Sequence, residues 1–330
     1  LKRIVAMTKP SIIITDNNCL EKLTPEDANV IVGQSSSANV GELETLSSLI
    51  SRHVGASPQR HNLQPDDIQA LKFTGGSSGT PKGVIQTYRV WNTCIASMIS
   101  SFDLNQTDRN LLAAPMTHGT NTLIMPIFSV GGSQVFMGPP KPESIIDAIE
   151  TFSPTTCFLP PTVIYMMMAE GGIEMRDLSS LRHLIVGGAS IRPDAIPNAM
   201  ALFNNALETC FGQTEVPQIA TCMRAEDWRD PLNTLSTGRA TEFTKIAIMD
   251  DEGTILSSGE SGELVIKGDL VMAGYLDLPN LTSKTIINGW LHTGDIGVID
   301  ERGFLFIKGR MRDVIITGGF NVYPSDVEAV

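Results

Sequence analysis

The residue types best suited to binding phosphate lie together in one short segment, Thr74-Gly75-Gly76-Ser77-Ser78-Gly79-Thr80-Pro81-Lys82-Gly83. Glycine adopts positive φ angles without steric cost, so successive backbone N–H groups can turn toward one anion. The hydroxyl groups add hydrogen-bond donors, and the lysine adds a compact positive charge. The segment predicts a phosphate-binding loop whose candidate contacts are Thr74, Gly75, Gly76, Ser77, Ser78, Gly79, Thr80 and Lys82.

This loop differs from the phosphate loop that opens a helix with Gly-Lys-Ser/Thr. Pro81 precedes the lysine and Gly83 follows it, so we expect a second strand, and no helix, after the loop. The alternative is a flexible surface hairpin, which Gly/Ser-rich stretches often form. The Thr-Pro-Lys-Gly ending between two expected strands argues against that alternative.

Two carboxylates stand where a nucleotide could use them. Glu215 follows Gly212-Gln213-Thr214 at the end of an expected strand, and ligand sites in α/β sheets gather at such ends. Its carboxylate could bind Mg²⁺ on ATP phosphates, because this ion takes oxygen ligands; an exposed loop acid is the alternative. Asp295, in a Thr-Gly-Asp segment between two expected strands, could accept hydrogen bonds from ribose hydroxyls. A turn aspartate is the alternative there.

Composition narrows the class of protein and of partner. The 330 residues carry 24 Lys plus Arg against 36 Asp plus Glu, a net charge of −12, which disfavours nucleic acid as a partner. The five cysteines show no metal-ligand spacing, and their odd number disfavours a complete disulfide framework. We therefore expect reduced cysteines in a cytoplasmic protein. No apolar run reaches transmembrane length, so we expect no integral membrane contact. The chain lacks a starting Met, and we expect its N-terminus to be a cut.

These candidates need a scaffold in which strands alternate with helices. Short apolar runs predict strands at residues 12–15, 70–74, 83–87, 110–114, 134–137, 156–159 and 184–187, the first of them buried. Helical periodicity predicts helices at residues 42–50, 88–101, 143–152, 161–170 and 193–203. In the second helix an apolar face is expected, with Thr87 as N-cap. The predicted fold class is α/β, with mostly parallel sheets layered with helices.

The pattern changes after about residue 215. Residues 246–249 with 254–256, and 297–299 with 304–307, each predict a hairpin around an acidic turn that contains glycine. With a further strand at 263–267, these hairpins predict a smaller antiparallel, barrel-like subdomain.

In their order along the chain, these motifs resemble the adenylate-forming superfamily: acyl- and aryl-CoA synthetases, luciferase-like enzymes and the adenylation domains of peptide synthetases. The phosphate loop departs from the usual pattern at Gly75, where serine is usual, and at Ser78, where threonine is common. The resemblance spans essentially the whole chain from about residue 70. Its other motifs are Pro115-Met116-Thr117-His118-Gly119, Val186-Gly187-Gly188-Ala189-Ser190, Cys210-Phe211-Gly212-Gln213-Thr214-Glu215, Gly262-Glu263-Leu264, Trp290-Leu291-His292-Thr293-Gly294-Asp295 and Gly309-Arg310-Met311-Arg312-Asp313.

The resemblance implies a role for each motif. It makes Lys82, Thr214 and Glu215 catalytic, with Glu215 as the metal ligand. It places His118, Gly187, Gly188 and Cys210 in the acyl pocket, and it makes Met311 and Arg312 the hinge. Besides the loop, it implies that nucleotide is bound by Gly188, Ala189, Ser190, Phe211, Gly212, Gln213, Thr214, Asp295 and Arg310.

The resemblance also implies a domain division. Residues 1–215 would form an α/β nucleotide- and acyl-binding core whose start is missing, and residues 216–310 a β-rich subdomain. Residues 311–330 would form the hinge and first strands of a C-terminal domain that supplies a further catalytic lysine beyond this sequence. We therefore expect these 330 residues to bind nucleotide and to adenylate poorly.

The reaction implied joins a carboxylic acid to the α-phosphate of ATP, with Mg²⁺, and transfers the acyl group to coenzyme A. The peptide-synthetase branch holds an ammonium group with an aspartate near the segment of His118, and no acidic residue stands there, so the resemblance disfavours an α-amino acid. Residues 317–328 resemble the hinge region of acyl-CoA synthetases, which favours a CoA ligase. A fatty acyl-AMP ligase, a luciferase-like enzyme and a catalytically inactive nucleotide-binding module remain open. The identity of the acid and the oligomeric state remain open as well.

Overall fold

A computed structural model describes residues 1–15, 22–23, 30–33, 44–74, 81–114, 116, 119–138, 140–313, 315–317 and 320–322. The chain divides into two compact units. Residues 1–64 with 73–83 form one unit, and residues 65–72 with 84–330 form the other. The predicted boundaries at 215 and 310 are a different kind of division and stay predictions.

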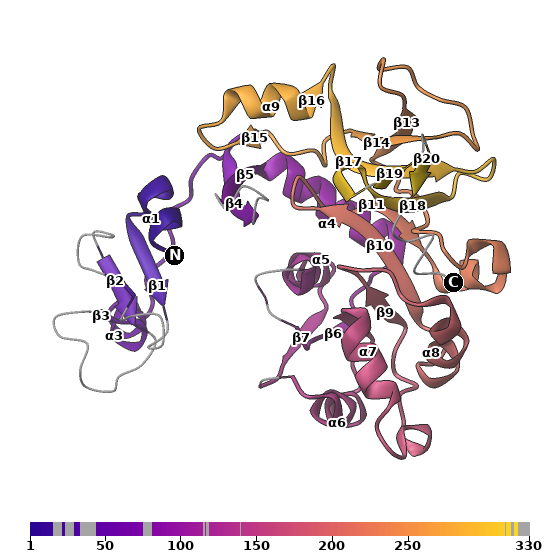
Figure 1. Ribbon diagram of the computed structural model, residues 1–330. Helices are drawn as coiled ribbons and strands as arrows, with labels where there is room; N and C mark the ends of the chain where they lie inside the picture. Colours follow the sequence, from indigo (N-terminus) through magenta and orange to yellow (C-terminus); the bar gives the residue numbers. More distant parts are fainter. Residues whose placement is uncertain are drawn as a thin grey trace. The chain divides into compact units, whose positions relative to one another are not determined.

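The first unit contains a small parallel sheet (Figure 1). Its strands run in the order β1 (Ile12–Thr15), β2 (Val30–Gly33) and β3 (Glu44–Thr45), with helices α1 (Lys2–Thr8) and α3 (Leu46–Arg52). The helix predicted at 42–50 begins at Leu46, because Glu44–Thr45 pairs with β2 and Thr45 caps the helix through the Ser48 N–H. The prediction that 12–15 is buried is wrong: Ile12 and Ile14 are 57% and 62% exposed.

A seven-stranded sheet forms the centre of the second unit. Five of its strands are parallel, and β11 and β12 extend it antiparallel to β10. The mostly parallel sheet predicted from the strand–helix alternation is thereby confirmed. The strand order is β12 (Arg239–Ala240), β11 (Val216–Met223), β10 (Leu207–Gln213), β9 (His183–Val186), β8 (Thr156–Leu159), β6 (Arg109–Leu112) and β7 (Ser133–Phe136).

Helices cover both faces of this sheet, and alternate residues of the strands supply two apolar cores. Cys157 and Leu159 of β8 join the core with α6, α7 and α8, whereas Phe158 of the same strand joins the core with α4 and α5. This alternation is the expected consequence of the two-residue period of a strand. The α-helices are α4 (Tyr88–Phe102), α5 (Ile124–Ser129), α6 (Pro142–Phe152), α7 (Pro161–Met168) and α8 (Ile196–Leu202).

Helix α4 confirms its sequence pattern in detail. Trp91, Met98 and Phe102 are buried on one face, and Thr87 accepts a hydrogen bond from the Val90 N–H as the N-cap. Five short 3₁₀ helices complete this part: η1 (Gly119–Leu123), η2 (Ile173–Met175), η3 (Pro193–Ala195), η4 (Ala225–Arg229) and η5 (Pro231–Asn233).

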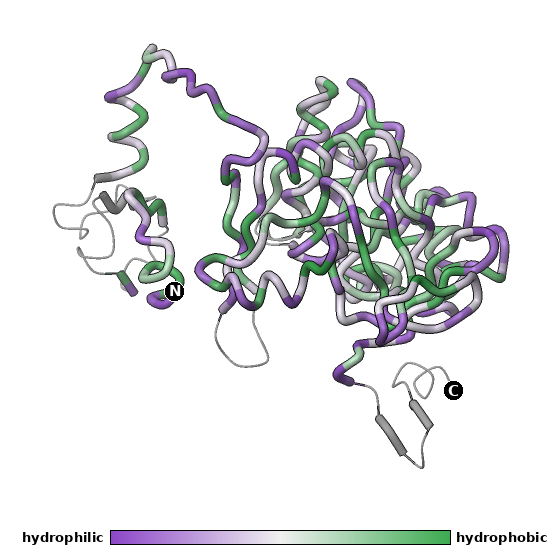
Figure 2. The backbone as a smooth tube through the Cα atoms, turned by 90° about the horizontal axis from the view of Figure 1, so that it is seen from above, coloured by the Kyte–Doolittle hydropathy of each residue, from purple (hydrophilic) through white to green (hydrophobic). Residues whose placement is uncertain are grey.

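The antiparallel subdomain is confirmed as a second sheet. Both predicted hairpins form around their acidic turns, the first closed by a bridge between Met249 and Ile255. Figure 2 shows apolar segments (green) running through the larger compact unit and hydrophilic turns (purple) at its rim. The sheet contains β13 (Lys245–Met249), β14 (Ser261–Lys267), β17 (Trp290–Ile299) and β16 (Ile286–Ile287), with β18 (Leu305–Arg310) on the other side of β17.

A third small sheet joins β4 (Ile68–Thr74), β5 (Lys82–Thr87) and β15 (Gly274–Tyr275), followed by helix α9 (Pro279–Thr285). The predicted phosphate-binding segment is thus flanked by two strands, as expected. Near the C-terminus, η6 (Met311–Asp313) precedes a hairpin of β19 (Ile315–Thr317) and β20 (Phe320–Val322). Within the described ranges no helix is both long and apolar enough to cross a bilayer.

Candidate functional site

Two of the predicted motifs follow neighbouring parallel strands and leave the sheet at the same edge. Thr209 of β10 lies beside Val186 of β9, and its hydroxyl donates to the Val186 carbonyl at 3.0 Å. Residues 187–190 therefore begin where β9 ends. Residues 211–215 comprise the end of β10 and the turn that follows it. Gly188 has φ +84°, a conformation that suits glycine. The carboxyl edge of an α/β sheet is the usual place for a ligand site.

The β10–β11 hairpin presents Thr214 and Glu215 in its turn. Gln213 pairs with Val216, and the register shifts between Phe211 and Gln213, which marks a bulge at Gly212. The turn is held from outside, because Gln86 Nε2 donates to the Thr214 carbonyl at 2.8 Å. Trp91 Nε1 in turn donates to Gln86 Oε1 at 3.0 Å. The turn therefore occupies one defined position.

We expect a Gly212→Ala substitution to distort this turn. A Cβ at this position would lie 2.6–2.8 Å from backbone atoms of Gln218, which cannot move aside as a flexible side chain can. Overpacking of this kind costs about 1–3 kcal/mol. Chemical denaturation measures the loss, and Gly171→Ala is the matched control, because no atom lies within 4 Å of its added Cβ. Equal stabilities of the two variants would contradict the expectation.

Asp295, Gln213 and Arg310 form a polar cluster that joins the two large sheets. Gln213 Nε2 donates to Asp295 Oδ2 at 2.6 Å, and Arg310 Nε lies 2.8 Å from Asp295 Oδ1. Gln213 Nε2 also lies 3.2 Å from the Thr293 carbonyl oxygen, which accepts a second bond from Arg310 at 3.3 Å. Three residues assigned to nucleotide binding from the sequence are thus brought into direct contact.

Asp295 was expected between two strands, with a turn aspartate as the alternative, and its setting differs from both. It lies inside the ten-residue strand β17, where two extra residues between His292 and Ile296 form a bulge against β14. Gly294, with φ +71°, makes this bulge. Asp295 does not lie in a turn, because β14 and β18 pair with β17 on both sides and the strand continues beyond Asp295.

The Asp295 carboxylate is buried at a cost. The residue is 3% exposed, whereas the Arg310 side chain is 44% exposed. Burial raises the pKa of Asp295 above its ordinary value, and the nearby Arg310 and Gln213 only partly offset this. A buried carboxylate with a perturbed pKa and a specific charge partner is a candidate for a functional site.

Glu215 is held by Tyr275, a residue that the sequence motifs did not single out. The Tyr275 hydroxyl donates to Glu215 Oε1 at 2.8 Å, and the Met272 N–H donates to the Glu215 carbonyl at 2.8 Å. Burial raises the pKa of Tyr275, and the Glu215 charge raises it further, so the phenol keeps its proton. The glutamate is a fixed acceptor and not a free loop acid.

Two of the residues assigned to the acyl pocket, Gly187 and Cys210, adjoin the apolar core that contains Phe158. A Cβ on Gly187 would lie 2.6 Å from this ring, and one on Gly119 would lie 2.4 Å from it, so both glycines leave room for the aromatic side chain. Cys210 belongs to the same apolar core and accepts a hydrogen bond from Gln218 Nε2 at 3.3 Å. Burial raises the pKa of its thiol to about 12, so Cys210 contributes volume and no nucleophile at neutral pH.

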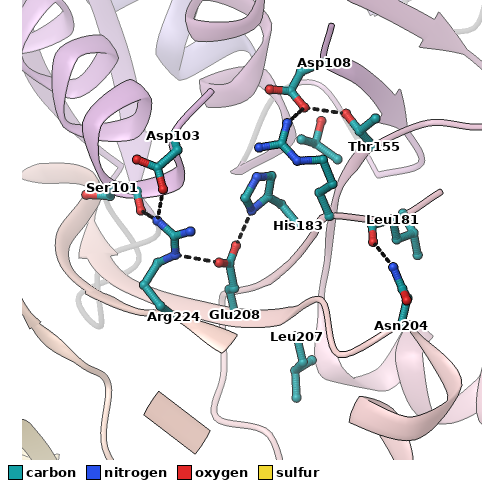
Figure 3. A network of polar contacts seen from close by, with 12 residues as sticks. Ser101, Asp103, Asp108, Thr155, Leu181, His183, Asn204, Leu207, Glu208 and Arg224 are labelled. Atoms are coloured by element: carbon teal, nitrogen blue, oxygen red, sulfur yellow. Dashed lines mark hydrogen bonds and ion pairs between the residues drawn. The ribbon is translucent and has the colours of Figure 1, made fainter. Parts of the chain in front are cut away.

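A buried charge network fixes the strands that carry the site (Figure 3). His183 Nδ1 of β9 lies 2.8 Å from Glu208 Oε2 of β10, and Arg224 Nε lies 2.8 Å from Glu208 Oε1. Arg224 also bonds the Ser101 carbonyl and lies 3.0 Å from Asp103 Oδ2, at the end of α4. The network ties helix α4 to β9 and β10 through buried hydrogen bonds and ion pairs.

Several predicted residues cannot be added to this geometry. Gly75, Gly76, Ser77, Ser78, Gly79, Thr80 and His118 lie outside the described residues. Thr74 ends β4 and Lys82 begins β5 in the other compact unit, so each is placed only within its own strand. Met311 and Arg312 form η6, directly after Arg310.

Sequence patterns missed Gln86, Phe158 and Tyr275. Gln86 and Phe158 lie in apolar strands that read as core, and Tyr275 lies 60 positions after its partner Glu215. The available signals were a polar residue in an apolar strand and the pair Gly274-Tyr275. Neither signal identifies a partner without the fold.

Known proteins resemble this chain in sequence. It matches the family described as AMP-binding enzyme over residues 1–276. A medium/long-chain-fatty-acid–CoA ligase, FadD8 of Mycobacterium tuberculosis, is 34% identical over 269 residues, which cover 82% of this chain and 47% of the relative. A feruloyl-CoA synthase of an Amycolatopsis species is 31% identical, with 80% of this chain and 53% of the relative covered. The chain spans about half the length of these curated relatives.

Solved structures share the fold. The amide bond synthetase McbA from Marinactinospora thermotolerans matches with a TM-score of 0.86 at 25% identity, covering 99% of this chain and 64% of that one. The anthranilate CoA ligase AuaEII, solved in complex with anthranoyl-AMP, matches with a TM-score of 0.89 at 21% identity, covering 100% and 65%. With a family match over residues 1–276 and this fold, the chain belongs to the AMP-binding enzyme family.

Proposed function

We propose that the whole protein activates a carboxylic acid with ATP, forms an acyl-adenylate with release of pyrophosphate, and transfers the acyl group to coenzyme A. The observation that carries this proposal is the contact of Gln213, Asp295 and Arg310 at the junction of the two large sheets. A carboxylate kept in a buried position is suited to accept hydrogen bonds from a ribose. The relatives named as acid–CoA ligases support the same reaction.

ATP and the acid are both anions, so the site must neutralise charge before they can meet. Lys82 and the backbone N–H groups of residues 75–80 would take the phosphates. Residues 188–190 and 211–214 would line the rest of the nucleotide, on the sheet edge that they share. Positioning and electrostatic stabilisation are then the main contributions of the protein to the first half-reaction.

Glu215 suits Mg²⁺ in its chemistry. A carboxylate offers about four lone-pair positions, and the Tyr275 hydroxyl occupies one, so acceptor capacity remains for a cation. Among the residues that the structure describes, no group of three or more His, Cys, Asp or Glu could hold a metal. A single carboxylate suits an ion that keeps several waters and binds substrate phosphates. When bound, Mg²⁺ would neutralise charge on the phosphates of ATP.

The acyl group would lie near Gly187, Gly188 and Cys210, with Phe158 beneath Gly187. We propose His118 as a further wall of this pocket, and Met311 with Arg312 as a hinge to a further domain. The acid has no ammonium group in this proposal, because no acidic residue stands beside His118 in the sequence.

One assay tests the proposal. Pyrophosphate release by the whole protein is measured over a panel of carboxylic acids, each with and without coenzyme A. We expect release that depends on the acid and a thioester that forms only with coenzyme A. Nucleotide binding without release for any acid would overturn the proposal in favour of a binding module. Acyl transfer to a carrier protein would replace coenzyme A as the proposed acceptor. Light emission with a luciferin would indicate a luciferase-like enzyme.

A further inference from the structure

The backbone on which Glu215 stands is fixed at two successive carbonyl groups. Gln86 Nε2 donates to the Thr214 carbonyl at 2.8 Å, and the Met272 N–H donates to the Glu215 carbonyl at 2.8 Å. Trp91 fixes Gln86 in turn. With the backbone held, the remaining freedom of Glu215 lies in the three rotatable bonds of its side chain.

Tyr275 removes that remaining freedom, because it is itself immobilised. Its hydroxyl donates to Glu215 Oε1 at 2.8 Å. Its backbone pairs with Val84 of β5, and its N–H donates to Thr282 Oγ1 at 2.9 Å. Gly274 permits this arrangement, since a Cβ there would lie 2.7 Å from Thr282 Cγ2 and its φ is +147°. The phenol thus reaches Glu215 from a rigid support.

We propose that Tyr275 is a positioning residue that orients the Glu215 carboxylate toward the divalent cation that accompanies ATP. This inference rests on the function proposed above. The position of a cation that binds through few protein ligands depends strongly on how each ligand is turned. A neutral phenol suits the task, since it fixes one oxygen without competing with the cation through charge. In this proposal Tyr275 acts through Glu215 and makes no contact of its own with the nucleotide.

Tyr275→Phe tests the proposal, because it removes only the hydroxyl. Calorimetry would measure ATP binding during a Mg²⁺ titration, and AMP binding in the presence of EDTA. We expect Mg²⁺ affinity at the ATP-bound protein to fall about tenfold, the scale typical for residues that orient a metal ligand, and AMP affinity to stay unchanged. Tyr88→Phe is the matched control: among the described residues its hydroxyl makes no hydrogen bond, and it should behave as wild type.

A double-mutant cycle separates positioning from a general structural role. Glu215→Gln should abolish most of the Mg²⁺ dependence, and Tyr275→Phe in that background should then add no further loss. A full second loss on the Glu215→Gln background would overturn the proposal, and so would unchanged Mg²⁺ affinity in Tyr275→Phe alone. An equal fall in AMP binding, or a matching fall in the unfolding midpoint, would also overturn it. If the unaltered protein bound no ATP at all, the proposed function would fail first.

Discussion

Replacement of Glu208 by alanine is expected to lower the free energy of unfolding by about 3–5 kcal/mol. Glu208 is buried and accepts hydrogen bonds or ion pairs from both His183 and Arg224. His183 Nε2 is already buried without a partner in the described part of the chain, so loss of Glu208 would leave both ring nitrogens unpaired. Removal of one partner from such a network is costly, because the polar groups that remain stay buried without partners.

Urea denaturation followed by tryptophan fluorescence measures the loss, and Glu226→Ala provides the control. Glu226 is an exposed acid on η4 with no hydrogen bond or ion pair among the described contacts. Its replacement should change stability by no more than about 0.5 kcal/mol. A loss below about 1 kcal/mol for Glu208→Ala would contradict the network's role in holding α4 to β9 and β10.

Replacement of Asp295 by asparagine is expected to weaken nucleotide binding about 10- to 100-fold, because hydrogen bonds to a charged group contribute about 1.5–3 kcal/mol. The stability of the protein at neutral pH should stay the same or rise. Burial raises the pKa of Asp295 in the folded state, so its stabilising contribution is present below the unfolded pKa and is lost as pH rises through the folded pKa. Asparagine resembles the neutral form and avoids that loss.

Asp300→Asn is the opposite case and a matched control. Partial burial raises the pKa of Asp300, but hydrogen bonds from the Phe304 N–H and Arg302 outweigh it and hold the pKa below its ordinary value. Its contribution to stability is present above the unfolded pKa and is lost as pH falls through the folded pKa. The variant should therefore be less stable at neutral pH while binding nucleotide normally. Equal nucleotide affinities for Asp295→Asn and the unaltered protein would contradict the assignment of Asp295 to nucleotide binding.

The sequence predicted those features that depend on neighbours along the chain. The apolar face and N-cap of α4 follow from a 3.6-residue period and one hydroxyl at Thr87. Both antiparallel hairpins follow from acidic turns with glycine between apolar runs. Glu215 was expected at the end of a strand, and it stands in the turn that ends β10. Local rules suffice for such elements.

Features that depend on distant partners could not be predicted in the same way. Asp295 lies within β17 and not in a turn, because β14 and β18 pair on both sides of it. The exposure of Ile12 and Ile14 could not be predicted from the sequence either, since an apolar run alone does not indicate which faces of a strand are covered. Tyr275 reaches Glu215 through the pairing of β15 with β5, a contact that no sequence spacing encodes.

In the proposed reaction, a carboxylate oxygen of the acid attacks the α-phosphate of ATP. This step is tested most directly by supplying the whole protein with ATP, coenzyme A and an acid labelled with ¹⁸O in its carboxylate. We predict AMP that carries one ¹⁸O in its phosphate, because the bridging oxygen of the acyl-adenylate leaves with AMP when the thiol attacks the carbonyl. Unlabelled AMP, or ADP with inorganic phosphate as the products, would contradict the account.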